Sequence, residues 1–145
     1  MLDTTKATVM RDFFCDCQYL EELDLSNFDT TKVTSFEGMF ARMYVLEELD
    51  LSNFNTSNLI TIKNMFSLAI SATETHESMM NCVPALKTVY VSNNWNISKV
   101  TETEAVFSNT TNLMGGNGTI FNSANSTAEY AVADIPGKVG YFTLK

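Results

Sequence analysis

Basic and catalytic side chains are scarce in this chain. Of its 145 residues, nine are Lys or Arg and one is His, against 17 Asp and Glu, so the formal net charge is −8 at pH 7. Nucleic-acid binding depends on basic side chains that neutralise phosphates, and so does attraction to anionic membrane surfaces. The composition therefore argues against both kinds of partner.

Cysteine is also rare, the three being Cys15, Cys17 and Cys82. One residue separates the first two, which strains a mutual disulfide, and an odd count leaves one thiol free. We expect neither a disulfide framework nor a tetrahedral zinc site, because too few suitable ligands are present. Free cysteines are commonly buried, so we interpret all three as thiols in or near the core.

Long hydrophobic runs are missing as well. No stretch of 18 apolar residues occurs, which predicts that the chain does not span a bilayer. The first residues do not combine a basic stretch with an apolar one, so no signal peptide is expected. What the chain does have is 45% hydrophobic residues and 44 Asn, Ser and Thr. This is enough for one domain with its own core and a neutral, hydrogen-bonding surface.

A 26-residue repeat organises the sequence. The nine residues Leu20–Phe28 are identical to Leu46–Phe54, and the segments before these two blocks also match at an offset of 26. A third copy begins at Leu86, after a 14-residue insertion, and a fourth unit closes near Leu113. Fixed periods of this length indicate a repeat architecture. Because the opening unit lacks its own strand segment, we expect a degenerate first unit or a fragment of a longer protein.

Each unit changes its hydrophobic period half-way. Residues such as Leu23, Asp24 and Leu25 alternate between apolar and polar, which is typical of a half-buried strand. The second half carries an apolar stripe at i, i+3, i+4 and i+7, which is typical of a short helix. In the second unit this stripe comprises Phe36, Met39, Phe40 and Met43. Thr34 and Glu37 add the pattern of a helix capping box.

The two halves together predict an α/β solenoid of parallel strands and short helices with a C-terminal β cap. We expect parallel strands near residues 22–26, 48–52 and 87–92, each followed about ten residues later by a short helix. Aromatic residues recur at one position per unit and predict a ladder of rings in the core. The ladder comprises Phe14, Phe40, Phe66 and Phe107.

The tail departs from the repeat. Glycine-rich residues 115–119 predict a turn cluster, and two β-like runs follow on either side of a Pro136–Gly137 turn. The exposed end of a repeat array needs covering. We therefore assign residues 1–114 to a solenoid of about four units, with an insertion near 67–85, and residues 115–145 to a capping segment.

The repeat Leu-x-x-Leu-Asp-Leu-Ser-Asn-Phe-x-Thr, followed by Val-Thr and Met-Phe, resembles that of the BspA-like leucine-rich-repeat surface proteins. These bacterial 26-residue repeats were formerly catalogued as a domain of unknown function. The resemblance rests on residues 20–40 and 46–66, and residues 112–119 look like the closing segment of that family. It implies a right-handed leucine-rich-repeat array, a cell-surface or secreted location and an adhesive role. It identifies no catalytic residue and no ligand site.

Side chains that point outward from the predicted strands form the candidate binding face. Because parallel strands lie about 4.8 Å apart, each carboxylate stacks on its counterpart in the next unit. This acidic face is suited to a basic protein partner or Ca²⁺, or it is only a repeated solubilising pattern. An outward tyrosine adds a possible aromatic anchor for a partner. The candidate partner-binding residues are Glu22, Asp24, Glu48, Asp50 and Tyr90.

The single histidine, His76, lies in the insertion between Glu74 and Glu77. It is either a general base or metal ligand or a solvated loop residue, and the lack of a second nitrogen ligand favours the loop. No nucleophile elbow and no Ser/His/Asp set stands out. We therefore expect no enzyme, no cofactor and no resident metal.

Two functions from different classes follow from these observations. The leading expectation is a non-enzymatic protein-binding or adhesion module of a bacterial cell-surface or secreted protein. Its partner would be a host-matrix or cell-envelope protein, and its signal and anchor would lie outside this chain. The alternative is a structural spacer or assembly module, in a wall, virion or repeat array, without a dedicated ligand.

Overall fold

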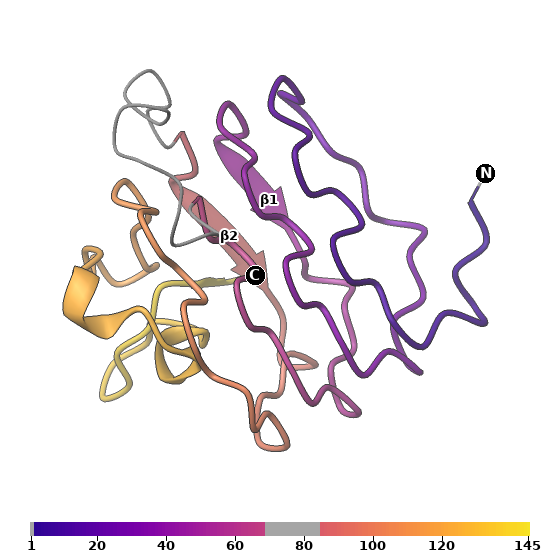
Figure 1. Cartoon of the computed structure of the whole chain (residues 1–145). Coiled ribbons are helices and arrows are strands. Elements are labelled where there is room, and N and C mark those ends of the chain that lie inside the picture. The colour runs from indigo at the N-terminus through magenta and orange to yellow at the C-terminus, as the bar shows by residue number, and fades with distance from the viewer. Residues whose placement is uncertain (1, 69–84) are drawn as a thin grey trace.

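The computed structural model describes residues 2–68 and 85–145. Successive 26-residue units lie side by side as turns of the chain, and the C-terminal segment packs at the end away from the N-terminus (Figure 1). The regular elements are β1 (Glu48–Asp50), β2 (Thr88–Val91), the 3₁₀ helices η1 (Ser123–Asn125) and η2 (Ala128–Tyr130), and β3 (Thr143–Leu144). The three strands form one parallel sheet in the order β1-β2-β3.

The predicted α/β solenoid is wrong. Within residues 2–68 and 85–145 there is no α-helix, and the strands are three short segments of one open sheet. Strands β1 and β2 do form at two of the expected places and are parallel, but none forms at 22–26. Instead of a β cap, the tail contributes the two-residue β3 and two single-turn 3₁₀ helices.

The expected helix at the Phe36–Met43 stripe is a pair of successive tight turns. The N–H of Met39 donates to the carbonyl of Phe36 (3.1 Å), and that of Ala41 donates to Gly38 (3.0 Å). Gly38 and Arg42 have φ values of 62° and 60°, in the left-handed region that interrupts a right-handed helix. The spacing of the buried side chains resembles that of a helix, but the backbone between them turns twice.

Backbone hydrogen bonds from these turns cross to the next unit. The N–H of Phe40 donates to the carbonyl of Met65 (2.9 Å), and the N–H of Phe14 donates to Met39 (2.9 Å). In a helix these N–H groups would bond to carbonyls four residues earlier in the same segment. The bonds between units pair the same N–H groups, so these donors are not left unsatisfied when the helix does not form.

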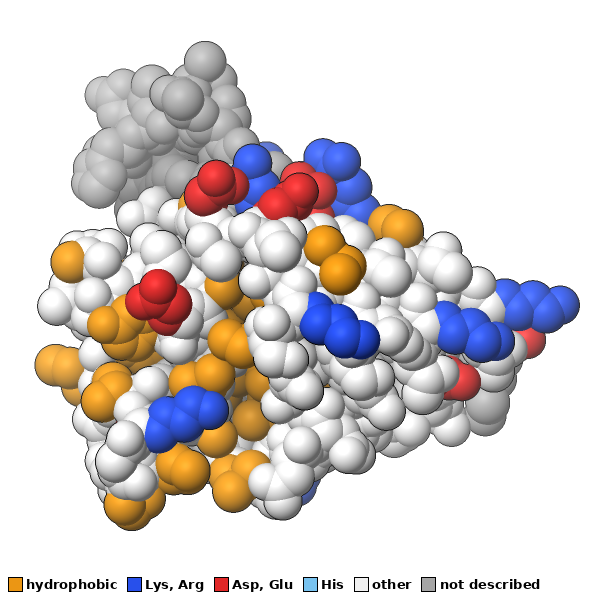
Figure 2. Space-filling model, turned by 90° about the horizontal axis from the view of Figure 1, so that it is seen from below, with side chains coloured by type: hydrophobic (Ala, Val, Ile, Leu, Met, Phe, Trp, Pro, Cys, Tyr) orange, Lys and Arg blue, Asp and Glu red, His pale blue; other side chains and the backbone are white. Residues whose placement is uncertain are grey.

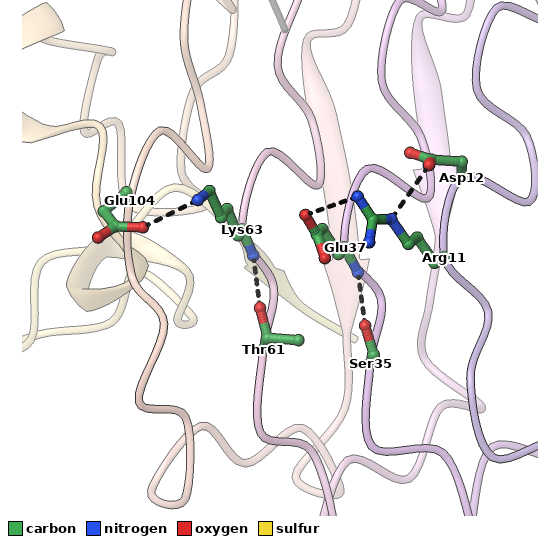
Figure 3. A network of polar contacts seen from close by, with 7 residues as sticks. All are labelled: Arg11, Asp12, Ser35, Glu37, Thr61, Lys63 and Glu104. Atoms are coloured by element: carbon green, nitrogen blue, oxygen red, sulfur yellow. Dashed lines mark hydrogen bonds and ion pairs between the residues drawn. The ribbon is translucent and has the colours of Figure 1, made fainter.

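Glu37, one residue of the expected capping box, connects two neighbouring units (Figure 3). Ser35 Oγ accepts from the N–H of Glu37 (3.3 Å), and the Glu37 carboxylate forms an ion pair with Arg11 of the preceding unit (3.3 Å). Lys63 and Glu104 pair in the same way two units further along (3.4 Å). Such exposed pairs contribute about 0–1 kcal/mol each, so they align the units more than they stabilise them.

The predicted aromatic ladder is confirmed. The rings of Phe14, Phe40, Phe66 and Phe107 follow one another with centroids 5.8, 5.8 and 5.6 Å apart and nearly parallel planes. Trp95 is half-buried against the core, and its Nε1–H donates to the carbonyl of Ala131 (2.8 Å). The ladder joins the units into a single hydrophobic core.

Cys15 and Cys17 are free thiols, each half-buried. Desolvation, reinforced by the nearby Asp16 carboxylate, raises the pKa of Cys15 to about 11. Cys82 and His76 lie outside the described residues, as does the predicted insertion near 67–85 apart from its ends. The division into residues 1–114 and 115–145 stays a prediction.

Candidate partner-binding face

The alternation predicted from the sequence places the candidate residues outward. Leu49 and Val89 are fully buried, whereas Glu48 is exposed and Asp50 and Tyr90 are half-buried. The parallel register of β1 and β2 sets Asp50 directly beside Tyr90. The alternation is therefore confirmed in the two strands that form.

An open groove runs across the outer side of β1 and β2. It brings together four of the five predicted residues, Glu22, Glu48, Asp50 and Tyr90, although they come from three different units. Asp24 lies outside this groove, in an adjacent depression that it shares with Asp50. The remaining groove residues are Glu21, Leu23, Glu47 and Lys145. We call this surface the acidic groove.

Lys145 is the residue of the groove that sequence reasoning missed. Strand β3 pairs with β2, and the N–H of Lys145 donates to the carbonyl of Val91 (2.9 Å). This pairing places the Lys145 ammonium on the Asp50 carboxylate and 5.2 Å from the centre of the Tyr90 ring. The only sequence signal was a basic residue directly after a β-like run, and that pattern does not identify its partner.

Hydrogen bonding controls the charge of the two aspartates of this region. Partial burial alone would raise the pKa of Asp50, but hydrogen bonds from Lys145 and from Ser52 outweigh it, so the pKa lies below its usual value. Hydrogen bonds from Ser26 lower the pKa of Asp24. The hydrogen bond to Asp50 raises the pKa of Lys145. Both aspartates and the lysine are therefore charged at neutral pH.

Only part of the negative charge in the acidic groove is compensated. Lys145 pairs with Asp50, and Lys87 pairs with Glu47 at 2.8 Å. Glu21, Glu22 and Glu48 form no ion pair with any residue that the structure describes. The groove therefore presents three unpaired carboxylates, a partly covered aromatic ring and the Lys145 ammonium group that pairs with Asp50.

The described parts of the chain show no metal centre. No group of three or more His, Cys, Asp or Glu side chains there is placed to hold a metal ion. The interpretation of the acidic residues as a Ca²⁺ site therefore gains no support from their geometry. What the acidic groove offers chemically is electrostatic attraction for cationic groups.

A second depression, between the last unit and the C-terminal segment, has a different character. Its lining includes Val91, Trp95, Val132, Ile135 and Leu144. Seen from below, the molecular surface is mostly uncharged, and hydrophobic side chains gather in a hollow toward one end (Figure 2). This depression also contains a charged residue, Lys138, but it has no carboxylate. Of the two, the acidic groove alone combines unpaired carboxylates with an aromatic side chain.

Comparison with protein families identifies the family of the chain. Residues 1–79 and 75–130 match the family described as a Mycoplasma protein of unknown function, DUF285. The chain belongs to this family. No curated protein and no solved structure matches this DUF285 chain. In the described parts of the chain, no helix is long and apolar enough to cross a membrane.

Proposed function

We propose that this DUF285 chain is a non-enzymatic protein-binding module of a BspA-like bacterial protein that is displayed at the cell surface or secreted. Its partner is a host-matrix or cell-envelope protein that presents basic residues. The observation that carries the proposal is the acidic groove, in which carboxylates from two units and Tyr90 from a third share one open surface. The BspA-like resemblance of the repeat supports the location.

The unpaired carboxylates favour a cationic partner. Glu22 and Glu48 are exposed and uncompensated, so they attract Lys and Arg side chains from solution. Complementary charge of this kind mainly speeds association and sets specificity. Contact energy comes more often from aromatic anchors than from carboxylates, which assigns that part to Tyr90.

The position of Lys145 indicates how a partner would bind. Its ammonium already occupies the site between Asp50 and the Tyr90 ring, where a partner's Lys or Arg would gain both a charge contact and a cation–π contact. Lys145 therefore acts as an intramolecular competitor. A partner either displaces this exposed side chain or binds beside it, against Glu22 and Glu48.

The test begins with a pull-down from purified matrix proteins and bacterial envelope proteins, using the whole chain. The partner's association and dissociation rates are then measured at two salt concentrations for Glu22→Gln with Glu48→Gln, and for the control Glu102→Gln with Glu129→Gln. Both pairs remove two exposed charges, but only the first lies in the groove. We expect slower association and a weaker salt dependence for the groove variant alone.

Equal effects of the two variants would contradict a specific role for the groove. The same series with Tyr90→Ala should leave association unchanged and speed dissociation. The alternative function, a structural or assembly module, is favoured by a different observation, the exposed apolar surface of the first unit. It predicts that no partner binds in the groove, whatever its charge.

A further inference from the structure

Over residues 10–16 and 36–42, which we call turn segments, the N–H groups that bond to a neighbouring unit all donate in one direction. Just before these segments the direction is reversed, since the N–H of Thr34 donates back to the carbonyl of Thr8 (2.8 Å). In the first unit the N–H groups of even residues donate to carbonyls of the next unit, as from Met10 to Ser35 (2.9 Å) and from Asp12 to Glu37 (2.9 Å). The second unit follows the same pattern, since the N–H of Gly38 donates to the carbonyl of Lys63 in the third unit (2.9 Å). Donors of each turn segment therefore face the following unit, and acceptors face the preceding one.

The odd N–H groups take no part in this ladder. Those of Met39 and Ala41 donate within their own turns, and that of Glu37 donates to Ser35 Oγ (3.3 Å). An ordinary strand edge shows N–H and C=O groups in alternation. Within the turn segments, by contrast, bonds to other units are made by carbonyls only toward the preceding unit and by N–H groups only toward the following one.

The first unit leaves such a row of carbonyls unused. By the 26-residue register, the carbonyls of Val9, Arg11, Phe13 and Cys15 correspond to those of Ser35, Glu37, Met39 and Ala41, which accept bonds from the first unit. None of the four receives a hydrogen bond from any residue that the structure describes. We call this the acceptor edge. It lies at the N-terminal end of the row of units (Figure 1).

The side chains at the acceptor edge are apolar ones that later units bury. Phe13 is 45% exposed, whereas the equivalent Met39 and Met65 are 0% exposed. Leu20, Leu23 and Phe28 are only half-buried, whereas the equivalent residues of the second unit are buried. The unused carbonyls and the exposed apolar side chains therefore lie on the same face, where one neighbouring segment would cover both.

A second copy of the chain does not fit this edge. Two acceptor edges placed against each other bring carbonyl against carbonyl, so the four acceptors of each stay unused. The opposite end is covered by the C-terminal segment, since the N–H of Phe107 donates to Ser126 (3.2 Å) and the N–H of Ala128 donates to the carbonyl of Thr103 (3.1 Å). An ordinary strand would place its own carbonyls against a row without donors.

We propose that the acceptor edge is a docking site for a polypeptide segment of the same 26-residue repeat type. The even N–H groups of that segment bond to the carbonyls of Val9, Arg11, Phe13 and Cys15. Its apolar residues cover Phe13 and the exposed side of Phe14, and so continue the aromatic ladder. This site is separate from the acidic groove and does not depend on its function.

The test extends the full chain by one unit. A copy of residues 29–54 is placed directly before Asp3, in the register that sets the copies of Phe36, Gly38, Phe40 and Arg42 against the four carbonyls. The control carries the same extra unit after Lys145, behind a flexible Gly/Ser linker. Hydrogen exchange is followed amide by amide, and the original amide of Phe40, bonded to Met65, shows whether the parent fold is intact.

Docking predicts that the four donor amides of the preceding copy exchange at least about tenfold more slowly than the same amides in the control. The thermal midpoint should also rise above that of the control, and Phe13→Ser in the extended chain should reduce both effects. Equal exchange in the two fusions overturns the proposal, and so does loss of protection at Phe40. It is also overturned if the parent chain dimerises and Phe13→Ser restores a monomer, because the edge then binds a second copy.

Discussion

Phe40→Ala tests whether the aromatic ladder stabilises the molecule as a whole. Phe40 is 3% exposed and stacks between Phe14 and Phe66 at 5.8 Å on each side. An internal cavity beside it measures only about 10 Å³, so its surroundings are already close-packed. Removing the ring leaves a void that the neighbouring units, tied by hydrogen bonds between their backbones, cannot close.

The expected cost is about 3–5 kcal/mol, the range for Phe→Ala in a core. Small domains have a total stability of about 5–15 kcal/mol, so the variant loses a large fraction of it. For a chain of this length that corresponds to a drop in the melting temperature of roughly 10–20 °C. Urea unfolding and calorimetry, each on the full chain, measure the two quantities.

Phe13→Ala is the matched control for this experiment. Phe13 is the same residue type in the first unit, but it is 45% exposed, so its truncation should cost only about 1 kcal/mol. The reasoning would be refuted if the two variants lost similar stability, or if Phe40→Ala moved the melting temperature by only a degree or two.

Three further predictions concern the C-terminal segment. Asp134 is buried and accepts hydrogen bonds from the N–H groups of Asn117 and Thr119 and from Thr119 Oγ. Burial alone would raise the pKa of Asp134, but these hydrogen bonds outweigh it and lower the pKa overall. The ionised Asp134 therefore contributes fully to the free energy of unfolding above about pH 4, and this contribution is lost as the pH falls through its lowered pKa. Asp134→Asn should destabilise the chain at pH 7 and flatten its acid unfolding profile. An unchanged profile would refute this. Gly140→Ala should cost about 1–3 kcal/mol by overpacking, measured by urea unfolding, because its Cβ would lie 2.2 Å from the carbonyl oxygen of Val132; wild-type stability would show that this contact relaxes freely. Lys145→Met should speed the association of a basic partner and increase its salt dependence, since it leaves Asp50 uncompensated; rates equal to those of the unchanged chain would place the binding site elsewhere.

The sequence by itself determined which side chains are buried. The 26-residue offset aligned Phe14 with Phe40 and Phe66, and these rings stack as expected. The alternation around Leu49 and Val89 distinguished the inward from the outward side of the strands. Both results depend only on the spacing of apolar residues, and that spacing is a local property of the chain.

Only the tertiary structure decided how the backbone closes its hydrogen bonds. A stripe at i, i+3, i+4 and i+7 suits a helix, but two tight turns bury the same side chains when the N–H of Phe40 bonds to Met65. No strand forms at 22–26, where carboxylates face the like charges of the next unit and the Asn53 side chain donates to the carbonyl of Leu25 (2.9 Å).

The composition of the acidic groove also depended on tertiary structure. Lys145 meets Asp50 across 95 positions of the sequence, because β3 adds to the sheet beside β2. Apolar spacing determines which face of a segment is buried. The partner of each backbone or charged group is selected from the whole chain, so it depends on contacts that no local pattern contains.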